Sequence, residues 1–336
     1  MTARPQILIA QMMPRSVLDA ALDTDIEVVG GMNREPLSHD DLLKQVPGMS
    51  GLIVTVNDKV GADVFDAAGD RLCVVATDSV GTDHVAVEEA TKRGIVVCNT
   101  PDILTAATAQ HALSLIMTCA NNLISENAKV ENGDWPYWDP YGYARELGHS
   151  TLGVVGCGRI GGQLVNYTRQ LFERIVVFDP YIERPPQGCV RMNTLEELLE
   201  EADVTSLHFP LTPETYHLLS DPQFEIMGNR KGGAPDLINA ARGAQVDTDA
   251  LVRALEQGWL RAAGLDVFEE EPLPVNHPIN KFPNVVKSRH VASGGEFTRI
   301  QMPLRAGRCA VAVILGNEPA SSVNYAEAMK HPRWAA

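Results

Sequence analysis

One stretch decides the fold of this chain: Thr151-Leu152-Gly153-Val154-Val155-Gly156-Cys157-Gly158-Arg159-Ile160-Gly161. The apolar run at 152–155 predicts a buried strand, and a G-x-G-x-x-G pattern follows it and opens a predicted helix at 161–171. Gly156 permits a tight turn, Gly158 lets the backbone approach a pyrophosphate, and Gly161 lets the helix pack close to the strand. Because the N-terminus of a helix attracts phosphate groups, the stretch predicts a dinucleotide-binding α/β unit.

An acidic residue stands where such a unit needs one. Asp179 lies 18 residues after Gly161, at the end of a predicted strand at 175–178. A carboxylate there can accept hydrogen bonds from the ribose hydroxyls of adenosine and repels a 2′-phosphate, so NAD is favoured over NADP. The alternative is that the glycines form only a structural turn. The strand, the helix and the acid together favour dinucleotide binding.

Strands and helices alternate on both sides of this stretch. Predicted strands lie at residues 6–11, 26–30, 51–56, 72–76 and 95–99 before it, and at 204–208, 236–240, 262–267 and 284–287 after it. Predicted helices lie at 15–22, 38–46, 105–122, 194–201, 248–257 and 298–315. Alternation of this kind predicts an α/β fold with mostly parallel sheets.

Length and composition bound the class of protein. The 336 residues correspond to two domains at about 150 residues each. Forty-three acids against 28 bases give a net charge of −15, which argues against nucleic acid or an anionic membrane as the main partner. No stretch approaches the roughly 18 apolar residues of a membrane span. The six cysteines form no C-x-x-C pair and no zinc-like cluster, so we expect a cytoplasmic protein with reduced thiols and no metal site.

A second group of polar residues follows the later strands. The four ionisable residues beyond these strand ends are Arg242, Asp266, Glu271 and His290. In an open parallel sheet, this edge is where ligands bind. Taken singly, each residue has an ordinary explanation as a surface charge or a structural polar group, and Glu271 stands in an acidic run that would normally be solvated. Their joint placement beside a dinucleotide site predicts an active site.

The chain resembles the D-2-hydroxyacid dehydrogenases, the NAD(P)-dependent, D-isomer-specific group, from about residue 51 to 323. The motifs that carry the resemblance are NTPDILT at 99–105, GCGRIG at 156–161, HFPLTPET at 208–215, NAARG at 239–243, GLDVFEEEP at 264–272 and the segment around His290. Within the family, GDWPYW at 133–138 most resembles the glyoxylate/hydroxypyruvate reductase branch. The resemblance implies an NAD-dependent oxidoreductase that interconverts a small 2-oxo acid and its D-2-hydroxy acid.

The resemblance also implies two Rossmann-like or flavodoxin-like domains with parallel sheets. A discontinuous substrate (catalytic) domain, 1–100 and 295–336, is expected to hold an inserted NAD-binding domain, 101–294. Long helices near 104–122 and 298–315 would connect the two domains and act as a hinge. A homodimer is expected through an aromatic-rich arm at 120–150, from which Trp138 would reach the active site of the partner.

Roles for individual residues follow from the same resemblance. His290 would exchange the proton, Glu271 would hydrogen-bond its other ring nitrogen, and Arg242 would hold the substrate carboxylate. Asp266 would accept from the carboxamide of nicotinamide. The cofactor contacts expected in all are Gly156, Gly158, Arg159, Ile160, Gly161, Asp179, His208, Pro210, Thr215, Ala240, Arg242, Asp266 and His290. The substrate contacts expected in all are Asn57, Val80, Gly81, Arg242 and His290.

Some interpretations stay open. The N–H groups of Val80 and Gly81 would form a second anchor for the substrate carboxylate, or their loop is a plain β-turn. An alternative of another class is an NAD(H)-sensing corepressor, similar to the C-terminal binding proteins of transcription, which keeps the same Arg–Glu–His set. Two departures from the usual pattern are Val-Ala in place of Ile-Gly at 291–292, and a glycine-rich stretch at 228–234 that contains Arg230.

Overall fold

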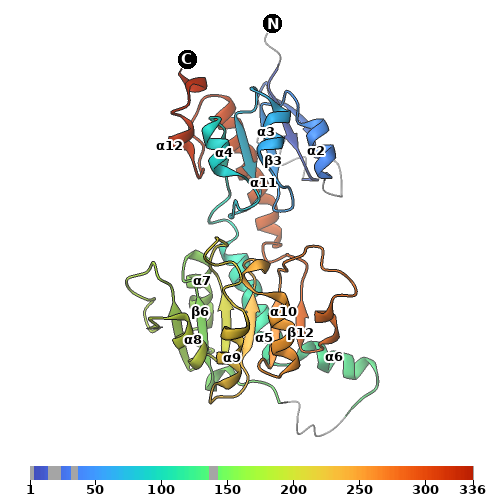
Figure 1. Ribbon diagram of the computed structural model, residues 1–336, viewed down its shortest axis with the longest axis vertical. Helices are drawn as coiled ribbons and strands as arrows, with labels where there is room; N and C mark the ends of the chain where they lie inside the picture. Colours follow the sequence, from blue (N-terminus) through green and yellow to red (C-terminus); the bar gives the residue numbers. More distant parts are fainter. Residues whose placement is uncertain (1–3, 14–23, 32–36, 136–142, 336) are drawn as a thin grey trace. The chain divides into compact units, whose positions relative to one another are not determined.

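The computed structural model describes residues 4–13, 24–31, 37–135 and 143–335. The chain divides into two compact units: Met1–Leu104 with Gly295–Ala336, and Thr105–Gly294 (Figure 1). The predicted helix at 15–22 lies outside the described residues, and so does Trp138. Among the described helices, none is long and apolar enough to cross a membrane.

The first unit is a five-stranded parallel sheet in the order β2-β1-β3-β4-β5, which is the flavodoxin-like order. Its strands are β1 Gln6–Ile9, β2 Glu27–Gly30, β3 Gly51–Val54, β4 Val74–Thr77 and β5 Val96–Cys98. Its helices are α2 His39–Gln45, α3 Ala62–Ala68, α4 Val87–Lys92, α11 Glu296–Ile314 and α12 Tyr325–Ala328. One face of the sheet packs against α11 and the other against α2, α3 and α4. Burial on both faces explains why these strands are continuous apolar runs.

The second unit is a seven-stranded parallel sheet in the order β12-β11-β10-β9-β6-β7-β8. Its strands are β6 Thr151–Val155, β7 Arg174–Phe178, β8 Val190–Arg191, β9 Val204–Leu207, β10 Asp236–Asn239, β11 Ala262–Leu265 and β12 Val285–Lys287. Strand order reverses between β6 and β9, and in doubly wound sheets this switch point is where ligands bind. The predicted α/β class with parallel sheets is confirmed.

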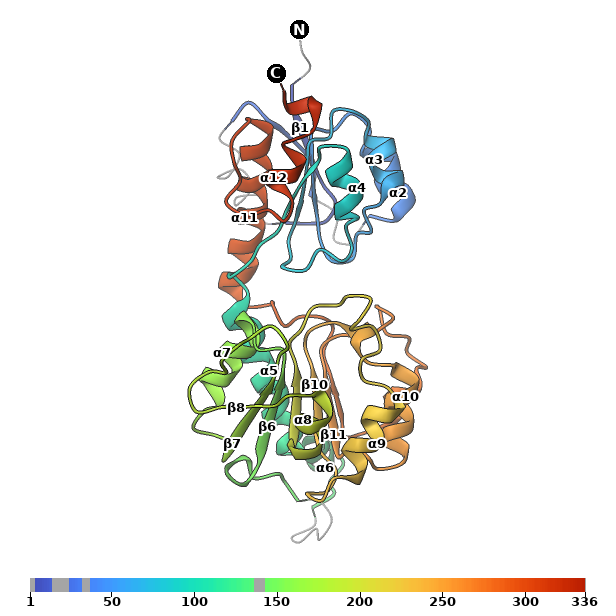
Figure 2. The same cartoon turned by 60° about the vertical axis from the view of Figure 1, so that its left-hand side comes forward.

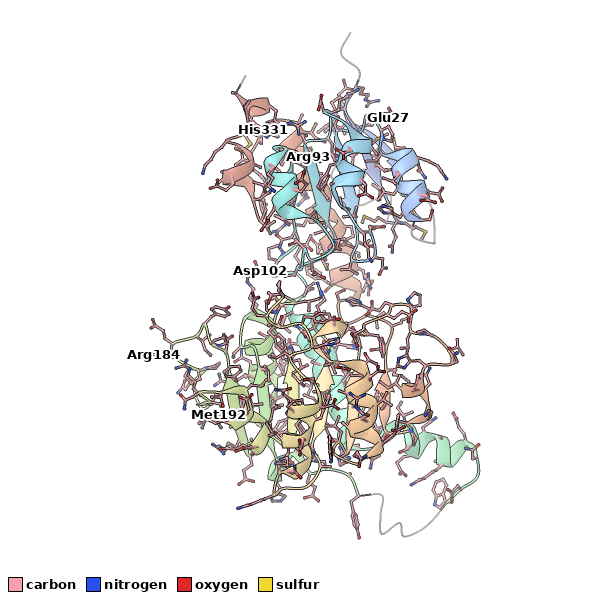
Figure 3. All side chains as sticks on the ribbon, viewed as in Figure 1. Glu27, Arg93, Asp102, Arg184, Met192 and His331 are labelled. Carbon is pink, nitrogen blue, oxygen red and sulfur yellow. The ribbon has the colours of Figure 1, made fainter. Side chains whose placement is uncertain are left out.

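Helices cover both faces of this second sheet (Figure 2). They are α5 Thr105–Ala120 and α7 Arg159–Thr168 on one face, and α8 Leu195–Glu201, α9 Asp221–Asn229 and α10 Thr248–Glu256 on the other. The helix α6 Leu123–Glu131 buries none of its residues. Side chains fill the space between layers: Met192 belongs to the core, whereas Arg184 lies on an exposed loop (Figure 3).

Predicted and observed elements agree where the sequence marks their ends. Ser38 caps α2 by accepting from the N–H of Asp41, and Thr194 caps α8 by accepting from the N–H of Glu197. The sequence did not predict α3, α4, α6, α9, α12 or the two-residue strand β8. The helices α3 and α4 lack a capping side chain, which is the signal that would have marked where they begin.

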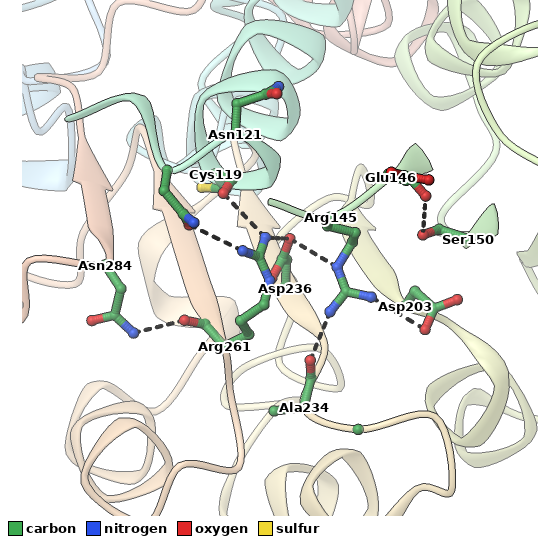
Figure 4. A network of polar contacts seen from close by, with 12 residues as sticks. Cys119, Asn121, Arg145, Glu146, Ser150, Asp203, Ala234, Asp236, Arg261 and Asn284 are labelled. Atoms are coloured by element: carbon green, nitrogen blue, oxygen red, sulfur yellow. Dashed lines mark hydrogen bonds and ion pairs between the residues drawn. The ribbon is translucent and has the colours of Figure 1, made fainter. Parts of the chain in front are cut away.

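A buried ionic network closes the amino-terminal edge of the second sheet (Figure 4). Asp236 begins β10 and accepts from Nε of Arg261 at 2.8 Å, and its Oδ2 lies 3.4 Å from Nε of Arg145. Arg261 also donates to the carbonyl of Cys119 and to Oδ1 of Asn122, both at 3.1 Å. The network therefore ties the C-terminal end of α5 to the sheet.

The same network explains the glycine-rich departure at 228–234. Arg230 pairs with Asp203 at 2.9 Å and donates to the carbonyl of Gly233 at 2.9 Å. A Cβ on Gly232 would lie 2.7 Å from the guanidinium of Arg230, and a Cβ on Gly228 would lie 2.4 Å from the ring of Trp259. Glycine at these positions makes room for the buried arginine and the indole.

Candidate active site

The glycine-rich turn between β6 and α7 has room for a phosphate group. Gly156 has a φ of 84°, and a Cβ there would lie 2.8 Å from the backbone of His208. A Cβ on Gly161 would lie 2.1 Å from the carbonyl oxygen of Gly156. A Cβ on Gly158 would meet nothing within 4 Å, so the space beside the N-terminus of α7 is open. These three glycines, with Arg159 and Ile160 in the first turn of α7, fit a dinucleotide pyrophosphate.

Asp179 follows β7 and holds the glycine-rich turn. It is 9% exposed, its Oδ2 accepts from the N–H of Cys157 at 2.8 Å, and its Oδ1 accepts from the N–H of Tyr181 at 2.9 Å. The sequence did not predict this structural role. A carboxylate offers about four acceptor sites, so two remain for ribose hydroxyls.

A loop after β9 carries three of the predicted cofactor residues. His208 contacts Gly156, and its Nε2 lies 2.8 Å from Oγ of Ser206. Burial lowers the pKa of the His208 imidazole to about 4, so this ring is neutral at physiological pH. Thr215 closes the loop by donating to the carbonyl of Pro210 at 2.8 Å.

The loop after β10 presents Arg242. Ala240 is the first residue beyond the strand and is buried. Asn239 donates to the carbonyl of Arg242 at 2.9 Å, while Gln245 donates to the carbonyl of Phe209 at 2.5 Å and accepts from the N–H of Arg242. Both amides are buried, and sequence reasoning missed them. The only sequence signal for their role is that an amide side chain stands at each end of the loop after β10.

Glu271 and His290 form a pair. Nδ1 of His290 lies 2.8 Å from Oε2 of Glu271, and each side chain is 27% exposed. Oε1 of Glu271 accepts from the N–H of Phe268 at 2.9 Å, which fixes the carboxylate. His290 has a φ of 52°, a left-handed conformation that is uncommon outside glycine. Since Nδ1 faces Glu271, Nε2 is the ring nitrogen that a ligand would meet.

Only one acid of the run at 269–271 pairs with this histidine. Glu269 instead lies 2.5 Å from Nε2 of His217 and accepts from the N–H of Thr248 at 2.7 Å. Burial alone would raise the pKa of Glu269, but the hydrogen bonds from Thr248 and His217 outweigh it and lower that pKa. Glu269 is therefore a structural acid, and Glu271 is the one available to chemistry.

Asp266 holds the loop that carries His290. Its side chain is fully buried, its Oδ1 accepts from Ser288 at 2.6 Å and from the N–H of Val291 at 2.9 Å, and its Oδ2 accepts from the N–H of Ala292 at 2.8 Å. The N–H of His290 donates to the carbonyl of Asp266 at 2.7 Å. The side chain has no exposed surface, so the hydrogen bond from a carboxamide to Asp266 stays a prediction.

The predicted substrate loop lies in the first unit, after β4. The carbonyl of Val80 accepts from Asn99 at 2.9 Å, and that of Gly81 accepts from Ser79 at 2.5 Å. The N–H groups of Val80 and Gly81 donate to no described residue. Asn57 is exposed and follows β3.

The predicted site residues thus fall into two groups. The first group follows strands of the second sheet, at its carboxyl edge. It consists of the Gly-rich turn, Asp179, the 208–215 loop, Ala240, Arg242, Asp266, Glu271 and His290. Asn57, Val80 and Gly81 belong to the other unit. Within the described part of the chain, no cluster of His, Cys, Asp and Glu could hold a metal ion.

Comparison with known proteins gives one family. The sequence model of the D-isomer specific 2-hydroxyacid dehydrogenase, NAD binding domain, matches residues 113–292, inside the second unit. A glyoxylate reductase of Thermofilum pendens is 38% identical over 329 residues, covering 96% of this chain and 95% of that protein. A glyoxylate reductase of Korarchaeum cryptofilum is 36% identical over 328 residues, covering 96% of each.

Solved structures agree with this result. An NADPH-dependent glyoxylate/hydroxypyruvate reductase from Sinorhizobium meliloti, in complex with NADP and malonate, has a TM-score of 0.82 at 30% identity, covering 97% of this chain and 98% of that one. D-lactate dehydrogenase from Aquifex aeolicus, complexed with NAD and lactic acid, has a TM-score of 0.79 at 28% identity, covering 94% and 98%. These relatives are reductases and dehydrogenases, which does not favour the corepressor alternative. The chain belongs to the D-isomer specific 2-hydroxyacid dehydrogenase family.

Proposed function

We propose that this chain is a nicotinamide-dependent reductase of small 2-oxo acids, which converts glyoxylate to glycolate or hydroxypyruvate to the D-2-hydroxy acid. The observation that carries the proposal is the Glu271–His290 pair, at the same sheet edge as the open space beside Gly158. The glyoxylate reductases that are 36% and 38% identical over nearly the whole chain support the substrate class.

Cofactor binding falls to the second unit in this proposal. Gly156, Gly158 and Gly161 hold the pyrophosphate at the N-terminus of α7, and Asp179 accepts from the adenosine ribose. The other residues that line the cofactor are Arg159, Ile160, His208, Pro210, Thr215, Ala240, Arg242, Asp266 and His290. When bound, the nicotinamide supplies the hydride that the reduction needs. The acid at Asp179 favours NAD over NADP.

Proton transfer falls to His290. The carbonyl carbon of the substrate gains the hydride, and the carbonyl oxygen gains a proton from Nε2 of the imidazolium, which leaves the ring neutral. Glu271 orients the ring through Nδ1 and stabilises its charged form. Arg242 binds the substrate carboxylate with its planar fork of donors and polarises the carbonyl.

The remaining substrate contacts come from the first unit. The N–H groups of Val80 and Gly81 form the second anchor for the substrate carboxylate, and Asn57 is a further substrate contact. In this assignment residues 1–100 and 295–336 form the substrate domain, and 101–294 form the cofactor domain.

The test is oxidation of NADH in the presence of glyoxylate, hydroxypyruvate, pyruvate or 2-oxobutyrate, with chiral analysis of the products of the last three, since glycolate is achiral. His290→Asn should lower kcat by about 10²- to 10⁴-fold, because it removes the proton donor. Glu270→Gln, an exposed acid next to Glu271, is the matched control and should keep the wild-type rate. Absence of turnover with every acid, or an L-product, would overturn the proposed function. A fully active His290→Asn variant would overturn the role of His290.

We also propose that the protein is a homodimer formed through α6 and the residues around it. Exposed apolar side chains gather there, and each of them is more than half exposed: Leu123, Ile124, Val130, Trp135 and Tyr143. In Figure 1, α6 projects from the sheet of its own unit. Several large apolar side chains left exposed on one short segment are typical of an interaction site. Light scattering of the wild type should give twice the monomer mass. Ile124→Glu should give a monomer, whereas the control variant Glu126→Gln should remain a dimer. A monomeric wild type would contradict this proposal.

A further inference from the structure

Three side chains from three elements meet beside the loop that carries His290. Asp266 follows β11, Ser288 follows β12, and His111 lies in α5. Nε2 of His111 lies 2.9 Å from Oγ of Ser288 and 3.3 Å from Oδ1 of Asp266. Oγ of Ser288 lies 2.6 Å from the same Oδ1. The mechanism proposed above uses neither His111 nor Ser288.

The direction of each hydrogen bond in this cluster follows from the donors available. The Ser288 hydroxyl donates its single proton to the carboxylate of Asp266, its closest acceptor. Oγ of Ser288 can then only accept from His111, so Nε2 of His111 carries a proton. The N–H of His111 is thus directed at both Ser288 and Asp266.

The carboxylate of Asp266 stays charged in this setting. Burial by itself raises the pKa of Asp266, but hydrogen bonds from His111, Ser288 and the N–H groups of Val291 and Ala292 outweigh burial and lower that pKa. Hydrogen bonds to a charged acceptor are about twice as strong as those to a neutral one. The two backbone N–H groups are therefore held firmly.

This hold bears directly on the proposed proton donor. His290 adopts a left-handed backbone conformation, which is strained for a non-glycine residue and persists only where the surroundings fix it. Asp266 binds the N–H of His290 through its carbonyl and the next two N–H groups through its carboxylate. One residue thus fixes three consecutive peptide groups, and His111 and Ser288 fix that residue.

The cluster also lies at the two places where the chain passes between the units. The second unit begins at Thr105, the first residue of α5, and it ends at Gly294. His111 lies in the second turn of α5, and Ala292 precedes Gly294 by two residues. On the side of the second unit, the cluster fixes both of these chain segments to the sheet.

We propose that His111 and Ser288 are positioning residues for the reaction: they hold the Asp266 carboxylate, which fixes the backbone at His290 and thereby aims its imidazole at the substrate. The proposal rests on the proposed function. Neither residue touches substrate or cofactor in it, so their effect should fall mainly on the rate of the chemical step, with a smaller effect on cofactor binding through Asp266.

The test compares kcat and the KM for NADH in a set of variants. His111→Leu removes the donor and keeps the bulk, and it should lower kcat about 10- to 100-fold, because a misplacement of about 1 Å can cost 10²-fold. The KM for NADH should rise by less than about tenfold, because Asp266 contributes at most one hydrogen bond to the cofactor. His111→Gln places an amide N–H near the position of Nε2 and should restore most of the rate. Gln110→Leu, at the exposed neighbouring position of α5, is the matched control and should behave as wild type.

A double-mutant cycle sharpens this test. Ser288→Ala should lower kcat like His111→Leu, and the double variant should be no slower than the worse single one, because both act through Asp266. Three outcomes would each overturn the proposal. They are a wild-type kcat in a folded His111→Leu variant, a kcat in His111→Gln no higher than in His111→Leu, and a fold-loss of kcat in the double variant equal to the product of the two single losses. If His111→Leu does not fold, Ser288→Ala decides alone.

A second readout separates this inference from the proposed function. Amide hydrogen exchange at Val291 and Ala292 should speed up at least tenfold in Ser288→Ala, whether or not the wild type turns over any 2-oxo acid. Unchanged exchange there would overturn the positioning role even in an active enzyme. An inactive wild type with faster exchange in the variant would overturn the proposed function alone.

Discussion

Replacing Asp179 by asparagine should change the choice between NADH and NADPH. The substitution keeps the size of the side chain and removes its charge. Two effects follow, because the carboxylate both faces the expected ribose site and accepts from the N–H groups of Cys157 and Tyr181. The first effect distinguishes the two cofactors, and the second does not.

The charge effect can be estimated from Coulomb's law. A carboxylate and one negative charge of a 2′-phosphate about 4 Å apart repel by about 1 kcal/mol in water and about 4 kcal/mol at an effective dielectric constant of about 20. Asp179 is 9% exposed, which places the pair between these limits. With tenfold per 1.4 kcal/mol, the ratio of kcat/KM for NADPH to that for NADH should rise about 5- to 10³-fold.

The structural effect lowers the activity with both cofactors. An asparagine oxygen can accept from only one of the two N–H groups, and the other then faces an NH₂ group. Leaving such a group unsatisfied costs about 1–3 kcal/mol, so kcat/KM for NADH should fall about 5- to 100-fold. This loss loosens the glycine-rich turn for NADH and NADPH alike and cancels in the ratio.

Steady-state kinetics with each cofactor at saturating glyoxylate measures both effects. Glu183→Gln is the control, because it removes an exposed acid from the same loop without touching the turn, and it should leave the ratio within about twofold of wild type. A ratio in Asp179→Asn that stays within twofold of wild type refutes the electrostatic reasoning. A wild type that already prefers NADPH refutes it as well.

Three further predictions concern other parts of the molecule. Gly158→Ala should weaken NADH binding in calorimetry and leave the unfolding midpoint unchanged, since its methyl group would occupy the open space beside α7. Gly161→Ala should instead lower stability by about 3 kcal/mol or more, because its Cβ would strike a carbonyl oxygen. Normal NADH binding by Gly158→Ala would contradict the phosphate site proposed beside α7. Burial raises the pKa of Asp78 to about 6, so its ionisation destabilises the fold as pH rises from about 4 through 6. Asp78→Asn should therefore raise the unfolding free energy by about 3 kcal/mol at pH 7.5 and by almost nothing at pH 4, and an equal gain at both pH values would contradict this sign. Asp236→Ala should lower stability by about 3 kcal/mol in urea, because it leaves Arg261 without a carboxylate partner and Arg145 with Asp203 alone. An unchanged midpoint would contradict the ionic network.

The fold was predictable because its signals are local. Each strand of three or more residues coincides with an apolar run in the sequence. The glycine pattern and its acid identify the dinucleotide-binding unit within one βαβ segment. The order of the strands was not predictable from periodicity, since it depends on which runs pair across the sheet. Helices such as α3 and α4 were missed because they are short and lack a capping side chain.

The candidate site was predictable only in part. Motifs gave Arg242, Glu271 and His290, but periodicity cannot separate Glu271 from Glu269, whose partner His217 stands far away in the sequence. The contacts of His111, Ser288 and Asp266 depend on three elements meeting in space, so no local sequence pattern predicts them. Val-Ala at 291–292 departs from the usual pattern without losing these contacts, because Asp266 binds the peptide N–H groups and not the side chains.

The left-handed backbone at His290 has a practical consequence for capturing the enzyme with its substrate. Asparagine is one of the few residues that adopt this conformation readily, whereas alanine resists it by roughly 1–2 kcal/mol. His290→Asn should therefore leave the loop in place while removing the acid, and His290→Ala should let the loop relax. The asparagine variant is the better choice for crystallising an unreacted ternary complex, because its pocket keeps the shape in which the substrate is bound.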